Sequence, residues 1–169
     1  MGDKESLKEA LLVQKLQNNF RESVLETNVF KGEVTHVVRK EALRAICNFL
    51  KSDPELRMNY LVDVLGVDYY PNVPRFEVVY HLYSVSRRHR VRLKVRVNEG
   101  EAVPTVADIW SAADWPEREA YDMFGIVFEG HPNLKRIYLS EDWEGHPMRK
   151  DYPLRGFKDR YNPYGEEKD

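Results

Sequence analysis

Two stretches in the middle of the chain alternate between apolar and polar positions, which is the period of a β-strand. The first covers residues 76–83 and the second covers 90–97, with a four-residue loop at 86–89 between them. Pairing Leu82 with Leu93 places the apolar side chains of both strands on one face, so we expect an antiparallel hairpin in that register. Shorter β-branched runs predict three more strands, at 24–30, 33–38 and 61–69.

Helices are expected where apolar residues recur every three to four positions. Start and stop signals for helices occur at Ser6-x-x-Glu9, Thr105-x-x-Asp108, Asp114-x-x-Glu117 and Gly125. Together with the apolar spacing they predict helices over 6–20 and 40–51, a short helix from 105, and a further helix that begins at 114 and ends at the glycine.

The pattern changes near residue 129, where prolines and glycines recur but Trp, Tyr, Phe and Leu persist. Disorder does not favour aromatic residues, and a long irregular segment that keeps them usually lies against something. The sequence therefore predicts an α+β fold. Residues 1–128 form a domain with a largely antiparallel sheet and helices packed on one face, and residues 129–169 form an extended, irregular C-terminal arm that binds a partner.

Composition narrows the chemistry. The chain has 169 residues, of which 42% are hydrophobic and 32% charged, as in an ordinary globular domain, and a net charge of −2 argues against a nucleic-acid partner. Its one cysteine, Cys47, cannot form an internal disulfide or supply the thiolates of an iron–sulfur cluster, so we expect a reducing compartment and any redox centre in a partner. With no apolar run of about 20 residues, membrane association is expected only through partners.

The most informative segment is 117–137, EREAYDMFGIVFEGHPNLKRI. Its acids and arginine admit an acid/base pair, a metal site, or a stabilised helix start in which Arg118 reaches Asp122. A network of charges between subunits is a fourth possibility. His131 and His146 are metal-ligand candidates, but they lie fifteen residues apart and each precedes proline, unlike the tight spacing of metal sites. We therefore expect both imidazoles to anchor the arm.

The pattern of this segment, followed by GHPMRKDYPL at 145–154, resembles the C subunit of NADH:quinone oxidoreductase (respiratory complex I) in its unfused form. These motifs cover roughly a quarter of the chain, with no departure inside the first block. The resemblance implies a peripheral subunit without catalytic, cofactor-binding or metal-binding residues of its own. NADH, FMN, iron–sulfur clusters and quinone would be held by partners: a quinone-site (D-like) subunit and iron–sulfur (B- and I-like) subunits. It also implies a place on the cytoplasmic face of the inner membrane.

A basic stripe follows one face of the second hairpin strand at Arg90, Arg92, Lys94 and Arg96, and includes Arg87 and Arg88 before it. It is either a solvated face or a docking face for an acidic protein, and nucleic acid is disfavoured because no aromatic residues interleave with it. Reversing Arg92 and Lys94 to Glu is expected to leave the chain folded. The residues expected at a partner interface are Glu117, Arg118, Glu119, Asp122, Phe124, Gly125, His131, Pro132, Arg136, Trp143, His146, Pro147, Arg149, Lys150, Asp151, Tyr152, Arg92 and Lys94.

Two alternatives stay open. Equivalent subunits occur in membrane-bound hydrogenases, F420H2-type dehydrogenases and the plastid complex, and the motifs separate these relatives poorly. An alternative of another class is a small stand-alone enzyme that uses Glu117, Glu119, Asp122 or His131 with a bound metal. Against it, the sequence contains no glycine-rich phosphate loop and no Ser or Cys nucleophile motif.

Overall fold

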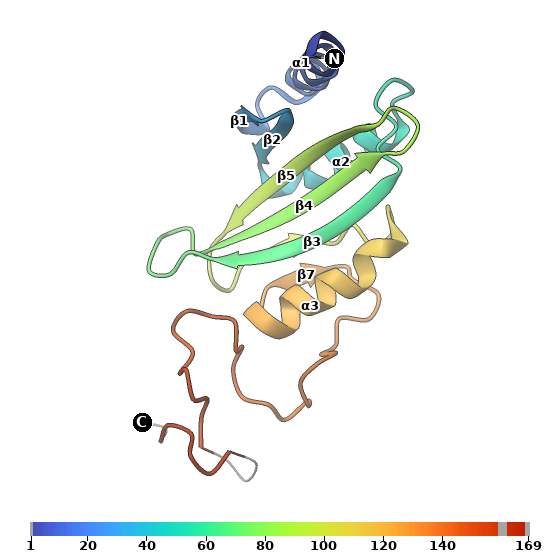
Figure 1. The fold of residues 1–169 in the computed structure, drawn as a ribbon. Helices are drawn as coiled ribbons and strands as arrows, with labels where there is room; N and C mark the ends of the chain where they lie inside the picture. The colour runs from blue at the N-terminus through green and yellow to red at the C-terminus, as the bar shows by residue number, and fades with distance from the viewer. Residues whose placement is uncertain (1, 159–161, 168–169) are drawn as a thin grey trace.

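The computed structural model describes residues 2–158 and 162–167, with side chains from residue 9 onward. Its main sheet has five strands in the order β1-β2-β5-β4-β3 (Figure 1). The strands are β1 (Val24–Phe30), β2 (Glu33–Val38), β3 (Tyr60–Asp68), β4 (Phe76–Ser84) and β5 (His89–Val97). All neighbours are antiparallel except β2 and β5, which run parallel. The predicted α+β class with a largely antiparallel sheet is confirmed.

The hairpin register differs from the expected one. Leu82 pairs with Val91 and Tyr80 with Leu93, so the turn is 85–88 and not 86–89. Moving the loop by one residue shifts the pairing by two residues, and a shift of two keeps every side chain on its own face. The apolar pattern therefore identified the buried face correctly but could not distinguish the two registers.

Helices cover one face of this sheet. They are α1 (Gly2–Phe20), α2 (Leu43–Ser52), which follows a 3-10 turn at Lys40–Ala42, and α3 (Asp114–Phe124), which follows another at Ser111–Ala113. Leu12 and Leu16 of α1 and Ile46 of α2 are fully buried against the apolar side of the strands. The predicted start of the first helix at Ser6 was wrong, because helical backbone already begins at residue 2. Side chains before residue 9, including that of Leu7 on the apolar face expected for this helix, lie outside the described residues.

The segment after β5 also departs from expectation. No helix forms at 105–108, and a hydrogen-bonded turn lies there instead. Two short strands that the sequence did not predict, β6 (Ala102–Pro104) and β7 (Val127–Glu129), pair in parallel. Three-residue strands are too short to show alternation. Beyond β7 the described part of the arm contains no helix or strand longer than one bridge (Figure 1).

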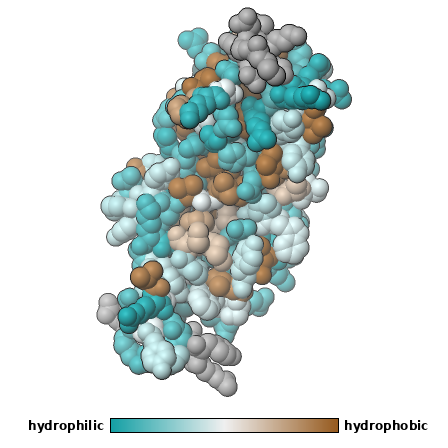
Figure 2. All heavy atoms as spheres, in the orientation of Figure 1, coloured by the Kyte–Doolittle hydropathy of each residue, from teal (hydrophilic) through white to brown (hydrophobic). Residues whose placement is uncertain are grey.

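The other face of the sheet carries the basic stripe, and three of its cations are paired within the chain. Each of the three meets a carboxylate on the same sheet: Arg92 with Glu33 at 2.8 Å, Lys94 with Glu77 at 2.7 Å, and Arg96 with Glu26 at 2.6 Å. Apolar side chains lie between the polar ones on the surface seen in Figure 2. The stripe is therefore neutralised in part by its own sheet.

These pairs revise the expectation for charge reversal. The Glu77 carboxylate is only 3% exposed and pairs with Lys94 and, at 3.3 Å, with Arg96, so Lys94→Glu removes the nearer partner of a buried charge and adds a second carboxylate beside it. We expect the free energy of unfolding to fall by about 1–3 kcal/mol in urea titrations. Arg92→Glu, which breaks a pair that is 30% and 48% exposed, is the matched control and should cost less than about 1 kcal/mol. Equal losses in the two variants would contradict this assignment.

Candidate functional site

Helix α3 and the arm meet at Gly125. The glycine ends the helix with φ +74°, and its N–H donates to the carbonyl of Tyr121 at 2.8 Å, as the sequence predicted. A Cβ here would lie 2.5 Å from His146 Nε2 and 2.6 Å from Arg149 Nη2. The position therefore excludes a side chain both because of the left-handed backbone and because the arm packs directly on it.

Glu117 lies on the buried side of α3 and does not close a capping box with Asp114. Its side chain has no exposed surface and accepts hydrogen bonds from the Thr105 hydroxyl and from the Val106 N–H at 2.8 Å. Among the described residues no Lys or Arg lies within ion-pairing distance of it. Burial raises the pKa of Glu117 to about 7, despite these hydrogen bonds.

Because burial favours the protonated form of Glu117, the folded state binds this proton more tightly than the unfolded state. Its contribution to stability is present below about pH 4.5 and is lost as pH rises through about 7. Glu117→Gln should remove that loss, worth roughly 3 kcal/mol. The measurement is the difference in unfolding free energy between variant and wild type from pH 4.5 to 8. Taking the difference separates Glu117 from the opposing titration of His36, because burial lowers the pKa of His36 to about 4. A difference that does not change with pH would contradict the assignment.

His131 anchors the start of the arm, as expected from its place before proline. The Asn133 N–H donates to Nδ1 at 3.1 Å, which fixes the neutral tautomer with its proton on Nε2. Nε2–H then donates to the carbonyl of Asp114 at 3.2 Å and lies 3.9 Å from a Glu117 carboxylate oxygen. The imidazole thus joins the arm to the first turn of α3.

Asp122 is the first of two anchors that hold the arm. Its buried carboxylate accepts hydrogen bonds from the N–H groups of Ile137, Tyr138 and Leu139 at 2.9, 2.8 and 3.2 Å, and pairs with Arg136 at 2.8 Å. Burial raises the pKa of Asp122, but the three N–H donors and the guanidinium outweigh it and hold the pKa below its ordinary value. We call this cluster the Asp122 anchor.

Two further contacts extend the Asp122 anchor. His146 Nδ1 donates to the main-chain carbonyl of Asp122 at 2.9 Å, and Arg136 donates to the carbonyls of Trp143 and Gly145, both at 3.2 Å. Arg118 does not reach Asp122. It bonds to the carbonyls of Lys135 and Arg136 at 3.0 and 3.4 Å.

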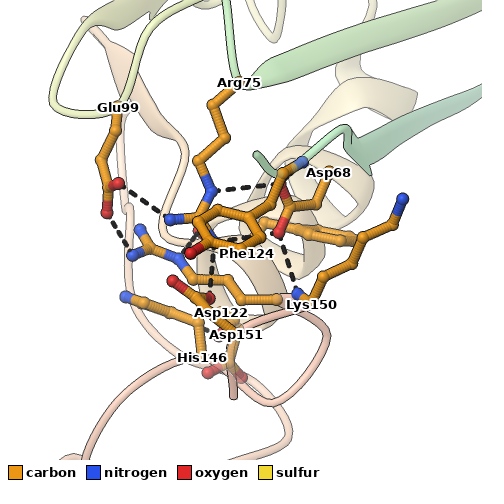
Figure 3. Close-up of polar contacts among 10 residues, drawn as sticks. Asp68, Arg75, Glu99, Asp122, Phe124, His146, Lys150 and Asp151 are labelled. Carbon is orange, nitrogen blue, oxygen red and sulfur yellow. Dashed lines mark hydrogen bonds and ion pairs between the residues drawn. The ribbon is translucent and has the colours of Figure 1, made fainter. Parts of the chain in front are cut away.

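The second anchor centres on Arg75, at the start of β4 (Figure 3). Its guanidinium, 8% exposed, pairs with Asp68 at 3.0 Å, Glu99 at 2.9 Å and Asp151 of the arm at 2.6 Å. Asp68 also accepts the Lys150 N–H at 2.9 Å. Three segments distant in sequence, the β3–β4 loop, the end of β5 and the arm, are therefore tied together by the Arg75 anchor.

Arg149 reinforces the Arg75 anchor. It donates to the carbonyl of Phe124 at 2.7 Å and pairs with Glu99 at 2.5 Å. The Phe124 ring in turn packs on Gly66 of β3, where a Cβ would lie 2.6 Å from the ring. The end of α3, the sheet and the arm are thus packed into one unit.

The outward side of α3 carries a different kind of surface. Trp115 and Tyr138 are 62% and 66% exposed. The Arg118 guanidinium lies 4.7 Å from the centre of the Trp115 ring, and the Tyr138 hydroxyl donates to Glu119 at 3.3 Å. We call these four residues the α3 surface.

The remaining predicted residues lie along the arm. Pro132 is exposed, whereas Trp143, Pro147 and Tyr152 are half-buried. Tyr152 covers Gly145 and packs edge-on against Phe157, with ring centres 5.3 Å apart. Tyr161, a further aromatic residue of this segment, lies outside the described residues. That these residues and the paired cations Arg92 and Lys94 contact a partner stays a prediction.

Sequence reasoning missed Asp68, Arg75 and Glu99 of the Arg75 anchor, and Trp115 and Tyr138 of the α3 surface. Arg75 and Asp151 are 76 positions apart, and no local spacing marks such a pair. Trp115 could have been named as a candidate, since aromatic residues are enriched at interfaces, but its exposure is visible only in the structure.

The described residues contain no group of three or more His, Cys, Asp or Glu side chains arranged to hold a metal ion. Over the same part of the chain, no helix combines the length and apolar character that a membrane crossing requires.

Fold and site together define an α+β domain that holds its own extended arm and presents exposed aromatic side chains and an arginine beside it. The sequence profile described as "Respiratory-chain NADH dehydrogenase, 30 Kd subunit" matches residues 36–158. The chain belongs to this family.

Curated relatives agree with the family assignment. The chain is 53% identical to the C subunit of the NADH-quinone oxidoreductase of Geotalea uraniireducens (strain Rf4) over 145 residues, 85% of this chain and 87% of that one. It is 54% identical to C subunit 2 of the NADH-quinone oxidoreductase of Rhizobium meliloti (strain 1021) over 136 residues, 80% and 75% of the two chains. A chain in the structure of the membrane-bound sulfane sulfur reductase, an archaeal respiratory membrane complex, superposes with a TM-score of 0.74 at 25% identity and covers 87% of this chain and 86% of that one.

Proposed function

We propose that the chain is a cofactor-free subunit of a proton-translocating NADH:quinone oxidoreductase and positions the quinone-site and iron–sulfur subunits for electron transfer from NADH to quinone. Its place is the cytoplasmic face of the inner membrane, which it contacts through partners. Family membership supports the parent complex, and the geometry of the arm supports the positioning role.

The observation that carries this proposal is that contacts within the chain hold the arm against its own domain. The two anchors fix its backbone at 137–139 and at 150, by N–H groups that donate to buried carboxylates. A segment ordered in advance loses less conformational entropy when it binds. A rigid arm also holds neighbouring subunits at fixed separations, on which transfer of electrons between their centres depends.

Side chains that point outward supply the contacts. Leu154 and Tyr164 of the arm are 101% and 85% exposed, and Met148 is 57% exposed. Together with the α3 surface they contribute Trp, Tyr, Met and Arg, the residue types enriched at interface hot spots. The charged residues of the anchors serve to hold this surface in place.

Trp115→Ala together with Arg118→Ala tests the proposal, because both side chains lie on the surface of α3. We expect the isolated chain to keep its melting temperature within a few degrees, while co-purification of the quinone-site subunit with the tagged chain falls at least about tenfold. The control is Arg21→Ala with Arg39→Ala, two exposed residues just before β1 and just after β2, at the end of these strands away from the β1–β2 turn. Undiminished co-purification would exclude the α3 surface as the docking surface.

A second candidate is the same positioning role in a related complex with another electron donor. The solved structural neighbour belongs to a sulfane sulfur reductase, which supports the alternative. The curated relatives from NADH-quinone oxidoreductases, at about twice that sequence identity, favour the first candidate.

A further inference from the structure

One end of the main sheet gathers turns that carry cations. The β1–β2 turn, the loop before β3 and the β4–β5 turn lie together there, because Val34 pairs with Val91, Ser84 with His89 and Tyr60 with Tyr83. The exposed cations at this end are Lys31, Arg57, Arg87, Arg88 and Arg90, which we call the turn end.

The cations of the turn end are not neutralised as those of the sheet face are. None of the five lies within ion-pairing distance of a carboxylate among the residues whose side chains are described. Arg87 donates to the carbonyl of Pro54 at 2.9 Å, and the Arg90 guanidinium lies 5.3 Å from the centre of the Tyr83 ring. In a chain whose net charge is −2, this end is therefore a local concentration of positive charge.

The backbone at the turn end is also unusual. Lys31, Arg57 and Arg88 have φ values of 49°, 47° and 52°, and they are the non-glycine residues with positive φ in the described chain. The left-handed region costs a non-glycine residue about 1 kcal/mol or more, and such residues cluster at functional sites. All three turns thus hold a long cationic side chain where glycine or asparagine would be less strained.

A hollow of about 250 Å³ lies beside these turns. It is lined by Arg88, His89, Arg90 and Tyr83, and by Glu9, Leu12, Gly32, Glu33 and Val34. Glu33 is already paired with Arg92. The hollow suits a few side chains of a partner and not a large cofactor, because ligand pockets usually exceed about 300 Å³.

We propose that the turn end is a second docking surface, which binds an acidic segment of a neighbouring polypeptide. Four of its five cations are arginines, and a planar guanidinium can donate two parallel hydrogen bonds to one carboxylate. Phe30 and Val85, 68% and 56% exposed beside two of the turns, add the apolar contacts that protein interfaces combine with charge. The Tyr83 ring is covered by Arg90, so it is not free to stack on a nucleic-acid base.

Zero-length carbodiimide cross-linking of the assembled complex tests this surface, because the reagent joins an amine only to a carboxylate in contact with it. Arg88→Lys supplies an amine at the turn end, and Arg21→Lys supplies one at the opposite end of the sheet. We expect position 88 to link to an Asp or Glu of another subunit and position 21 to give no such link. Links from position 88 only to acids of this chain, or none at all, would overturn the proposal.

A second measurement separates the chemical classes of partner. Arg88→Gln with Arg90→Gln should weaken binding of the purified chain to a fluorescent Asp/Glu-rich peptide about tenfold, and more salt should weaken the wild type as well. The matched control is Arg21→Gln with Arg39→Gln, which removes the same charge elsewhere. Retention by anionic lipid vesicles or by duplex DNA with no binding of the peptide would overturn the assignment to a polypeptide. The α3 surface lies apart from these residues. If the α3 variants failed to reduce co-purification, the peptide test could therefore still support or overturn the proposal for the turn end.

Discussion

Asp122→Ala is expected to release the arm. The substitution leaves three main-chain N–H groups and the Arg136 guanidinium without their buried acceptor. Removing one partner from such a cluster costs about 3–5 kcal/mol, of which the unsatisfied donors account for the larger share. Amide exchange at 137–139 should therefore accelerate by at least about a hundredfold, since each 1.4 kcal/mol changes an opening equilibrium tenfold.

Two controls define what the Asp122 result means. Asp122→Asn keeps the shape and one acceptor oxygen but loses the charge, so it should fall between wild type and Asp122→Ala. Glu119→Gln changes a carboxylate on the same helix that lies at the surface and should leave exchange at 137–139 unchanged. If Asp122→Ala also left these amides protected, the carboxylate would not be what holds the arm.

Arg75→Gln is expected to have the second large effect. It leaves the Asp68 carboxylate, whose side chain is 2% exposed, without its cation, and it frees Asp151 of the arm. We expect the free energy of unfolding to fall by about 3–5 kcal/mol, and proteases should cut near 149–152 much faster.

Arg44→Gln is the matched control for Arg75→Gln. It breaks a bidentate pair with Asp108 whose side chains are 41% and 58% exposed. Its cost should stay near 1 kcal/mol, without new cleavage in the arm. Comparable losses in both variants would show that the Arg75 anchor is no stronger than a surface ion pair.

Local patterns in the sequence predicted much of the fold. Alternation located the long hairpin, β-branched runs located β1 and β2, and Gly125 marked the end of α3, because each of these depends on residues close in sequence. The parallel pairing of β2 with β5 and the hairpin register were beyond this reasoning. The parallel pairing depends on segments distant in sequence. The register cannot be read from alternation, because a shift of two residues leaves an alternating pattern unchanged.

The site was predicted as a set of residues but not as an arrangement. The block at 117–137 looked like one continuous interface, yet the structure divides it. Glu117 and Asp122 face inward, and Arg118 and Glu119 face outward. A helix with a period of 3.6 residues must divide neighbouring charges in this way, but which side is inward depends on the sheet and on the arm. Arg75 and its partners are brought together only by the tertiary structure, so no local pattern in the sequence predicts their contacts.

We propose that these residues act through assembly and not through chemistry. The most direct test measures the abundance of intact complex and the quinone-reductase turnover per complex on the same membranes from Asp122→Ala cells. We expect abundance to fall about tenfold or more, while each remaining complex turns over at close to the wild-type rate. Full abundance with turnover reduced by orders of magnitude would contradict it, because that is how a group with a direct role in proton or quinone chemistry behaves.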